Sequence, residues 1–104
     1  MARLEVASVC GSSRVSRADG EQLRHAMEAR WAAEEPTVID FAGVVIASVS
    51  FFDESFGLLA LAHPTVELGR RFRVENIGAP DRNLLNSIVS ARARERAAAE
   101  RASA

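Results

Sequence analysis

The sequence predicts an α/β fold in which a mostly parallel central sheet is flanked by helices. Segments with strand-like polarity alternate with segments of helical periodicity, in the order strand, helix, strand, helix, strand, helix. The strand segments are spaced almost evenly, and each gap is long enough for a helix that crosses over to a parallel neighbour. The chain length is consistent with this fold class, because 104 residues correspond to a single domain with one core.

Three segments are predicted to be strands. Residues 4–10 alternate between two faces and are followed by Gly-Ser-Ser, which is a turn signal. Residues 37–46 are β-branched and almost continuously apolar, which is typical of a strand covered on both faces. We therefore expect this strand to be central. Residues 71–77 alternate again and end at Gly78.

Three segments are predicted to be helices, over residues 19–33, 50–62 and 81–95. The first carries apolar side chains three and four positions apart, and Asp19 is its expected cap. The second begins at Ser50, and Pro64 ends its strongest part. The third opens at Pro80-Asp81, a common way for a helix to begin.

The tail differs in composition from the domain, which we place at residues 1–90. Residues 91–104 contain seven Ala, four Arg, two Glu and one Ser, with no large apolar side chain. Such a segment has high helix propensity but nothing to anchor it to a core. We predict a helical or frayed extension there.

Charge and apolar content exclude several classes of function. Thirteen basic and fourteen acidic residues give a net charge of -1, which does not favour binding to nucleic acid or to anionic lipid. No apolar run approaches the roughly 20 residues of a membrane helix, and the start of the chain has no signal-peptide pattern. A single Cys forms no internal disulfide. We expect a soluble cytoplasmic protein, without membrane insertion, whose oligomeric state the sequence does not indicate.

Three motifs resemble the STAS superfamily of anti-sigma-factor antagonists and sulfate-transporter domains. They are Thr37-Val-Ile-Asp-Phe-Ala-Gly-Val44, Phe56-Gly57-Leu58-Leu59 and Arg71-Phe-Arg-Val-Glu-Asn76. The stretch Ser48-Val-Ser-Phe-Phe-Asp-Glu-Ser-Phe-Gly57 is similar to a bacterial STAS-like family. This resemblance implies a STAS-like sandwich and a small non-catalytic regulatory domain that needs no cofactor. The implied partner is a histidine-kinase-like ATPase or an anti-sigma factor, bound in partner switching.

The resemblance also implies where the partner binds. It places the partner surface at the start of the second helix, on Ser48, Ser50, Phe51, Asp53 and Glu54. It gives Asp40, Gly43 and Gly57 the role of shaping the loop before that helix. The phosphoserine position of the antagonists falls on Ser50 when counted from Gly43, but on Glu54 when counted from Gly57. Ser50 is thus the phosphorylation candidate.

The residues themselves suggest simpler roles for the same segment. Ser50 and Asp53 have the spacing of a capping box, in which the Ser50 hydroxyl accepts a backbone hydrogen bond. Asp53 and Glu54 would repel a phosphate, so the site could instead be permanently acidic. Two adjacent aromatic residues are not expected to point inward together, so we predict that Phe51 or Phe52 is exposed.

Two other interpretations belong to different functional classes. Cys10 and Arg14 could form an oxyanion site in a small thiol enzyme, although the more common role for a lone Cys on a strand is in the core. The chain could also be a small-ligand sensor. His25 and His63 have no metal-ligand spacing. Asp40, at the end of a buried strand, should accept hydrogen bonds from loop N–H groups.

Overall fold

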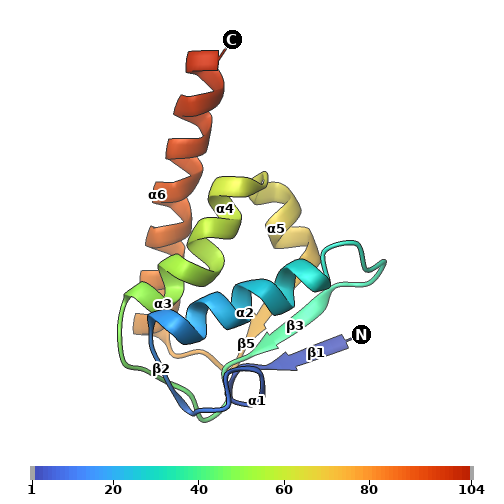
Figure 1. The fold of residues 1–104 in the computed structure, drawn as a ribbon, viewed down its shortest axis with the longest axis vertical. Coiled ribbons are helices and arrows are strands. Elements are labelled where there is room, and N and C mark those ends of the chain that lie inside the picture. Colours follow the sequence, from blue (N-terminus) through green and yellow to red (C-terminus); the bar gives the residue numbers. More distant parts are fainter. Residues whose placement is uncertain (1, 104) are drawn as a thin grey trace.

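A computed structural model describes residues 2–103 and confirms the predicted α/β class with its mostly parallel sheet (Figure 1). The main sheet has three strands in the order β1-β3-β5, and both neighbouring pairs are parallel. These strands are β1 (Ala2–Glu5), β3 (Thr37–Asp40) and β5 (Phe72–Glu75). A second parallel sheet pairs β2 (Arg14–Val15) with β4 (Val45–Ile46). The predicted central position of the second main strand is therefore confirmed.

The helices are α1 (Val6–Cys10), α2 (Arg17–Ala29), α3 (Ser50–Phe52), α4 (Leu58–Ala62), α5 (Thr65–Arg71) and α6 (Ala79–Ser103). A π-helical turn, η1 (Asp53–Gly57), joins α3 to α4 without a break. Figure 1 shows α2 and the α3–α4 helix on one side of the sheet, while the end of α6 extends away from the rest of the molecule. No helix within residues 2–103 is long and apolar enough to span a membrane.

The predicted first strand, residues 4–10, is wrong from residue 6 onward. β1 ends at Glu5, opposite the last residue of β3, Asp40, so residues 6–10 have no strand to pair with. They form α1 instead, and Gly11 closes this helix in the left-handed conformation, at φ 68°. The glycine that indicated the end of a strand is therefore the C-cap of a short helix.

The second predicted strand is also shorter than expected. It stops at Asp40, and residues 45–46 leave the main sheet to pair with β2. The break occurs at Gly43, whose φ of 71° is a turn conformation that a strand does not contain. Val44 N–H donates to the carbonyl of Phe41 at 3.0 Å and closes this turn.

The helices differ from the prediction at both ends of α2, at α5 and at α6. α2 is capped by Ser16, and Asp19 at the third helical position completes the capping box by accepting from Ser16 N–H at 2.9 Å. α2 ends at Ala29, with a turn where residues 30–33 were expected to be helical. α5 was not predicted, and α6 continues to Ser103.

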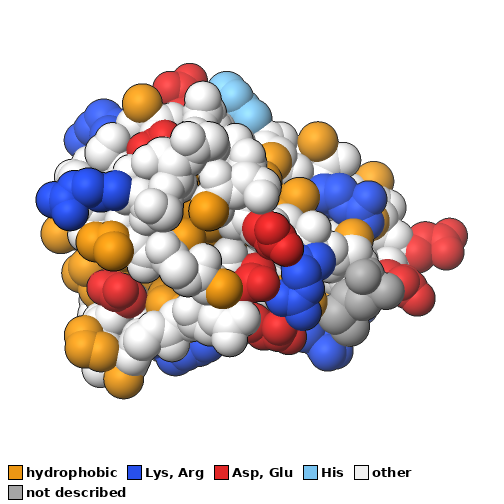
Figure 2. Space-filling model, turned by 90° about the horizontal axis from the view of Figure 1, so that it is seen from below, with side chains coloured by type: hydrophobic (Ala, Val, Ile, Leu, Met, Phe, Trp, Pro, Cys, Tyr) orange, Lys and Arg blue, Asp and Glu red, His pale blue; other side chains and the backbone are white. Residues whose placement is uncertain are grey.

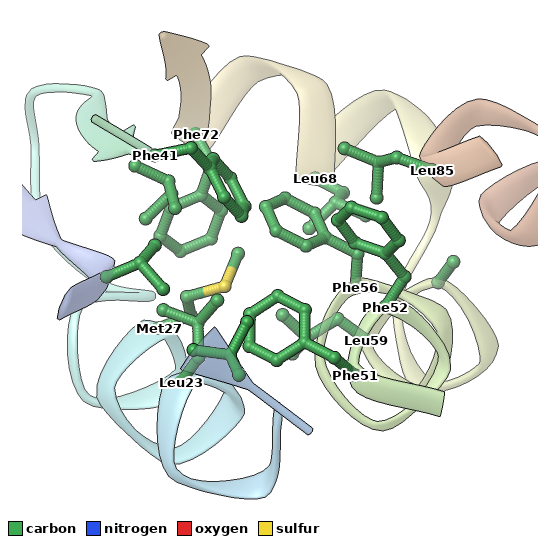
Figure 3. Close-up of a cluster of buried hydrophobic side chains, with 14 residues drawn as sticks. Leu23, Met27, Phe41, Phe51, Phe52, Phe56, Leu59, Leu68, Phe72 and Leu85 are labelled. Carbon is green, nitrogen blue, oxygen red and sulfur yellow. The ribbon is translucent and has the colours of Figure 1, made fainter. Parts of the chain in front are cut away.

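Side chains alternate between the two faces of the main sheet. One face carries Leu4, Ile39, Phe72 and Val74 and packs under the helices. The core continues into an aromatic cluster around Phe41. The centroid of its ring lies 6.2, 6.1 and 6.5 Å from those of Phe51, Phe52 and Phe56, respectively. Figure 3 shows these rings together with Leu23 and Met27.

The opposite face of the sheet is charged. Arg3, Val38 and Arg73 lie side by side across the three strands, and Glu5, Asp40 and Glu75 form the next row. Arg3 bridges the two rows, at 2.8 Å from Asp40 and 3.0 Å from Glu75. Seen from below in Figure 2, acidic and basic side chains lie next to one another near the lower centre of the view.

Candidate functional site

The candidate site is the loop of residues 41–49 together with the start of α3, and Asp40 fixes the entry to this loop. The Asp40 carboxylate accepts hydrogen bonds from Ala42 N–H at 2.9 Å and Asn76 Nδ2 at 2.8 Å, and Arg3 lies 2.8 Å away. The expected hydrogen bond from a loop N–H is thus present. These three donors, Asn76 first, lower the pKa of Asp40, so the carboxylate stays charged and the ends of β3 and β5 stay joined.

The middle of the loop is held by the short second sheet. After the Gly43 turn, Val45 N–H donates to Ser13 O at 2.7 Å and Ala47 N–H donates to Val15 O at 2.8 Å. The entry and the middle of the 41–49 segment are therefore hydrogen-bonded to other parts of the chain. A loop fixed in this way loses little conformational freedom when it binds a partner.

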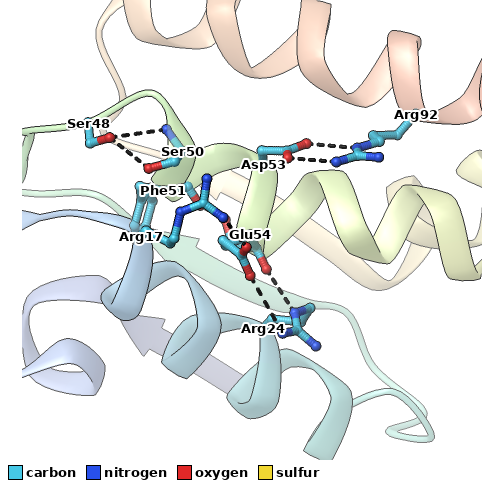
Figure 4. A network of polar contacts seen from close by, with 9 residues as sticks. Arg17, Arg24, Ser48, Ser50, Phe51, Asp53, Glu54 and Arg92 are labelled. Carbon is cyan, nitrogen blue, oxygen red and sulfur yellow. Dashed lines mark hydrogen bonds and ion pairs between the residues drawn. The ribbon is translucent and has the colours of Figure 1, made fainter.

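The predicted capping box of Ser50 and Asp53 is wrong, because the helix begins at Ser50 with Val49 as its N-cap, so Ser50 is not itself the cap. Ser48 also binds the first turn: its carbonyl accepts from Phe51 N–H at 3.0 Å, and its hydroxyl accepts from Ser50 N–H at 3.3 Å. The hydroxyls of Ser48 and Ser50 lie 2.7 Å apart, as Figure 4 shows. Ser50 is thus the first helical residue, and Asp53 is free for another role.

Asp53 binds α6 instead. Its two carboxylate oxygens accept from Arg92 Nε at 2.8 Å and Arg92 Nη2 at 2.7 Å (Figure 4). This bidentate contact lowers the pKa of Asp53. Gly57 makes room for it, because a Cβ on Gly57 would lie 2.6 Å from Asp53 Oδ1 and 3.1 Å from Ile88 Cγ2. The loop-shaping role expected for Gly57 is thus better described as close packing of η1 against α6.

Glu54 points the other way, toward α2. It lies 2.7 Å from Arg17 Nη1 and 3.8 Å from Arg24 Nη2, and Arg24 Nε donates to the Glu54 carbonyl at 2.8 Å. The side chains of Asp53 and Glu54 are only 33% and 19% exposed. Each carboxylate is therefore paired with arginine inside the molecule, and the two do not present an open acidic surface. Their role in partner binding stays a prediction.

The prediction that one of Phe51 and Phe52 is exposed is wrong, because both are fully buried. The α3–α4 helix has α2 on one side and α6 on the other, so neighbouring side chains about 100° apart both reach the core. The contact with α2 is very close: a Cβ on Gly20 would lie 2.5 Å from the Phe51 carbonyl oxygen. A glycine inside a predicted helix was the available signal for this contact.

Two large apolar side chains remain exposed at this site. Val45 is 54% and Val49 is 55% exposed, and the half-buried Ser48 and Ser50 lie in the same segment. Among the residues the structure describes, only Val66 on α5 is a comparably exposed large apolar side chain, at 70%. The exposed part of the site includes these two valines and the half-buried serines beside them in sequence, and we call these four residues the Val-Ser surface (Val45, Ser48, Val49 and Ser50).

Cys10 and Arg14 do not form a reactive pair. Cys10 is half-buried at the end of α1, and its thiol donates to the Asp19 carbonyl at 3.4 Å. Burial raises the pKa of Cys10 to about 11, which disfavours the thiolate that a nucleophile requires. Arg14 is exposed on β2, and no contact between the two side chains occurs in the described part of the chain.

The histidines occupy separate positions. His25 is exposed on α2, whereas the His63 ring stacks on Trp31 with centroids 3.7 Å apart and its Nε2 lies 3.1 Å from Glu28. Within residues 2–103 no group of three or more His, Cys, Asp or Glu side chains has a geometry that could hold a metal ion.

Residues 19–82 match the model of a family described as the STAS-like domain of unknown function (DUF4325). The match covers more than half of the chain, and it includes the 41–49 loop and η1. The chain belongs to this STAS-like family. No curated protein and no solved structure shows a significant match to it.

Sequence reasoning missed the basic partners of the site. Arg92 lies 39 residues from Asp53, and Arg17 lies 37 residues from Glu54, so no local spacing links them. Asn76 was included in the third STAS motif, but its bond to Asp40 follows only from the pairing of β3 with β5.

Proposed function

We propose that this chain is a non-catalytic regulatory domain that binds a protein partner through the Val-Ser surface. The single observation that carries the proposal is the exposure of Val45 and Val49, at 54% and 55%, on a loop that is otherwise fixed. Exposed apolar side chains with a polar surround are typical of protein interaction sites. Membership of a STAS-like family supports the same class of function.

The proposed partner is a histidine-kinase-like ATPase or an anti-sigma factor, as the STAS resemblance implies. Regulation by phosphorylation at Ser50 is compatible with the local charges. Asp53 and Glu54 are paired with three arginines, so they oppose a phosphate less than free carboxylates would. A phosphate on Ser50 would also break its 2.7 Å contact with Ser48 and alter the Val-Ser surface.

The competing thiol-enzyme hypothesis gains no support from the geometry. Its nucleophile would be Cys10, whose thiol is half-buried and whose pKa is raised by burial to about 11. A reactive cysteine needs a lowered pKa and a nearby cation. We therefore propose that the domain acts by binding.

The test compares two exposed valines. Histidine-kinase-like ATPases and anti-sigma factors of the source organism are purified singly and titrated with the protein by calorimetry. One of them should bind the wild type, and Val49→Asp should weaken that binding by about tenfold or more, since a buried, unpaired carboxylate is costly at an apolar interface. Val66→Asp is the matched control, because it changes a comparably exposed valine on α5.

The proposal is wrong if none of these proteins binds, or if both variants weaken binding equally. Phosphorylation is tested separately. The bound partner is incubated with ATP, and the protein is analysed by mass spectrometry with Ser50→Ala as the control. Modification of the wild type but not of Ser50→Ala supports the phosphorylation candidate, whereas an unmodified wild type contradicts it.

A further inference from the structure

A cleft that takes no part in the Val-Ser surface lies between α5 and α6, above the free edge of β5. It has a volume of about 270 Å³. Its floor is formed by Phe56, Leu68, Phe72 and Leu85, each only 4–5% exposed. Figure 3 shows Leu68 between Phe72 and Leu85 at one side of the core. The cleft is therefore a half-open hollow whose floor belongs to the packed core.

One cation stands at this cleft. Arg82, in the second turn of α6, is exposed and is the only charged residue in the lining. One of its nitrogens donates to the Val74 carbonyl at 3.2 Å, which holds the guanidinium at the edge of β5. Within the described residues no carboxylate pairs with Arg82. The amide of Asn86, one helical turn further along α6, lines the same cleft.

The edge of β5 explains why a carbonyl is available there. In a parallel sheet the backbone groups of successive residues point to alternate sides. Glu75 O accepts from Phe41 N–H on the β3 side, at 3.0 Å, so the carbonyl of Val74, one residue earlier, faces the free edge. The Val74 carbonyl therefore positions Arg82 without neutralising it, and the guanidinium keeps donors for an anion.

From the apolar floor, the unpaired cation and the size of the opening, we propose that this cleft binds a small amphiphilic carboxylate. The volume of about 270 Å³ lies just below the range of sites that take drug-sized ligands, so the expected ligand is small, with about ten non-hydrogen atoms. The apolar body lies against Phe56 and Phe72, and the carboxylate pairs with Arg82. This site is independent of the proposed partner surface.

Gly69 offers a way to block the cleft without disturbing the fold. It lines the cleft from α5, and a Cβ built on it meets no atom within 4 Å. A leucine at this position points a side chain into open space, and it also has higher helix propensity than glycine. Gly69→Leu should therefore fill the cleft while the protein remains folded.

The experiment uses octanoate, which has ten non-hydrogen atoms, and its neutral analogue octanamide. Both are titrated into the full chain and followed by calorimetry and by amide NMR shifts. Octanoate should bind saturably and about tenfold more tightly than octanamide, with the largest shifts at Gly69, Val74 and Arg82. Arg82→Gln should remove this preference, and Arg82→Lys should restore part of it. Arg94→Gln, an exposed arginine further along α6, is the control and should change nothing.

Gly69→Leu should weaken binding of both compounds by more than tenfold with an unchanged or raised unfolding midpoint. Absence of octanoate binding, equal affinity for the two compounds, or unchanged binding by Gly69→Leu would each refute the site. A concentration-dependent dimer in sedimentation that Gly69→Leu dissolves would also refute it, because a second copy of the chain would then be the occupant.

Discussion

Replacement of Gly20 by alanine should destabilise the protein, although the same change usually strengthens a helix. In a helix interior, Gly→Ala is favourable by ~1 kcal/mol. At Gly20, however, the new Cβ would lie 2.5 Å from the Phe51 carbonyl oxygen and 3.0 Å from Glu54 Cβ. Both obstacles belong to the backbone or to its first side-chain atom, so α2 and α3 must move apart. Overpacking of this kind costs about 1–3 kcal/mol, and a backbone obstacle belongs at the upper end of that range. The net loss should be about 1–2 kcal/mol.

Gly69→Ala is the matched control, because its Cβ meets nothing within 4 Å. This variant should be stabilised by about 0.5–1 kcal/mol. The two variants should thus differ by roughly 1.5–3 kcal/mol, which is on the order of 10 °C in Tm for a domain of this size. Urea titration and thermal melts followed by circular dichroism at 222 nm measure the difference. Equal stability of the two variants would show that α2 and α3 are not in the close contact described.

Three further outcomes are expected. Asp53→Asn should lower the free energy of unfolding at pH 7 by about 1 kcal/mol, because a partly buried ion pair with Arg92 is lost. The pKa of Asp53 is lower in the folded than in the unfolded protein, so the ion pair contributes its full stability above the unfolded pKa near 3.9. This contribution is lost as the pH falls through the folded pKa. Wild type and variant should therefore have the same stability in urea titrations at the lowest pH. Iodoacetamide should alkylate Cys10 at pH 8.5 on the order of a hundredfold more slowly than a free thiol, because a pKa of about 11 leaves little thiolate; a rate equal to that of free cysteine would contradict this burial. Truncation after Ala97, where side-chain burial on α6 ends, should change stability by no more than about 0.5 kcal/mol, whereas truncation after Ser90 removes Arg92 and should cost at least about 1 kcal/mol in the same denaturation assay.

The α/β class could be predicted from the sequence because hydrophobic periodicity is a local property. Leu23 and Met27 on α2, and the continuous apolar run of β3, mark their elements without any knowledge of neighbours. The length of β1 could not be predicted in this way. Residues 6–10 alternate like a strand, but β3 ends opposite Glu5 and leaves them without a partner. Strand length is thus set by the neighbouring strand as much as by the segment itself.

The position of the site in the chain could be predicted from the sequence, but the burial and the ion pairs of its side chains could not. Asp40 was expected to need hydrogen-bond donors, since a carboxylate at the end of a buried strand is costly without them. The burial of both Phe51 and Phe52 depends on α6, which packs against the α3–α4 helix but lies far from it in the sequence. The pairing of Asp53 and Glu54 with Arg92, Arg17 and Arg24 likewise depends on distant segments, so the sequence alone indicated an acidic surface.

The parallel order β1-β3-β5 has a consequence for how the chain folds. Ala2 pairs with Thr37, and Thr37 pairs with Phe72, so each strand must find a neighbour 35 residues away. No hairpin can nucleate this sheet, and the loss of chain entropy must come before any ladder hydrogen bond forms. Contacts between α2 and the α3–α4 helix are equally distant, with a sequence separation of 37 between Arg17 and Glu54. We therefore expect the sheet and the helical layer to form together in one cooperative step.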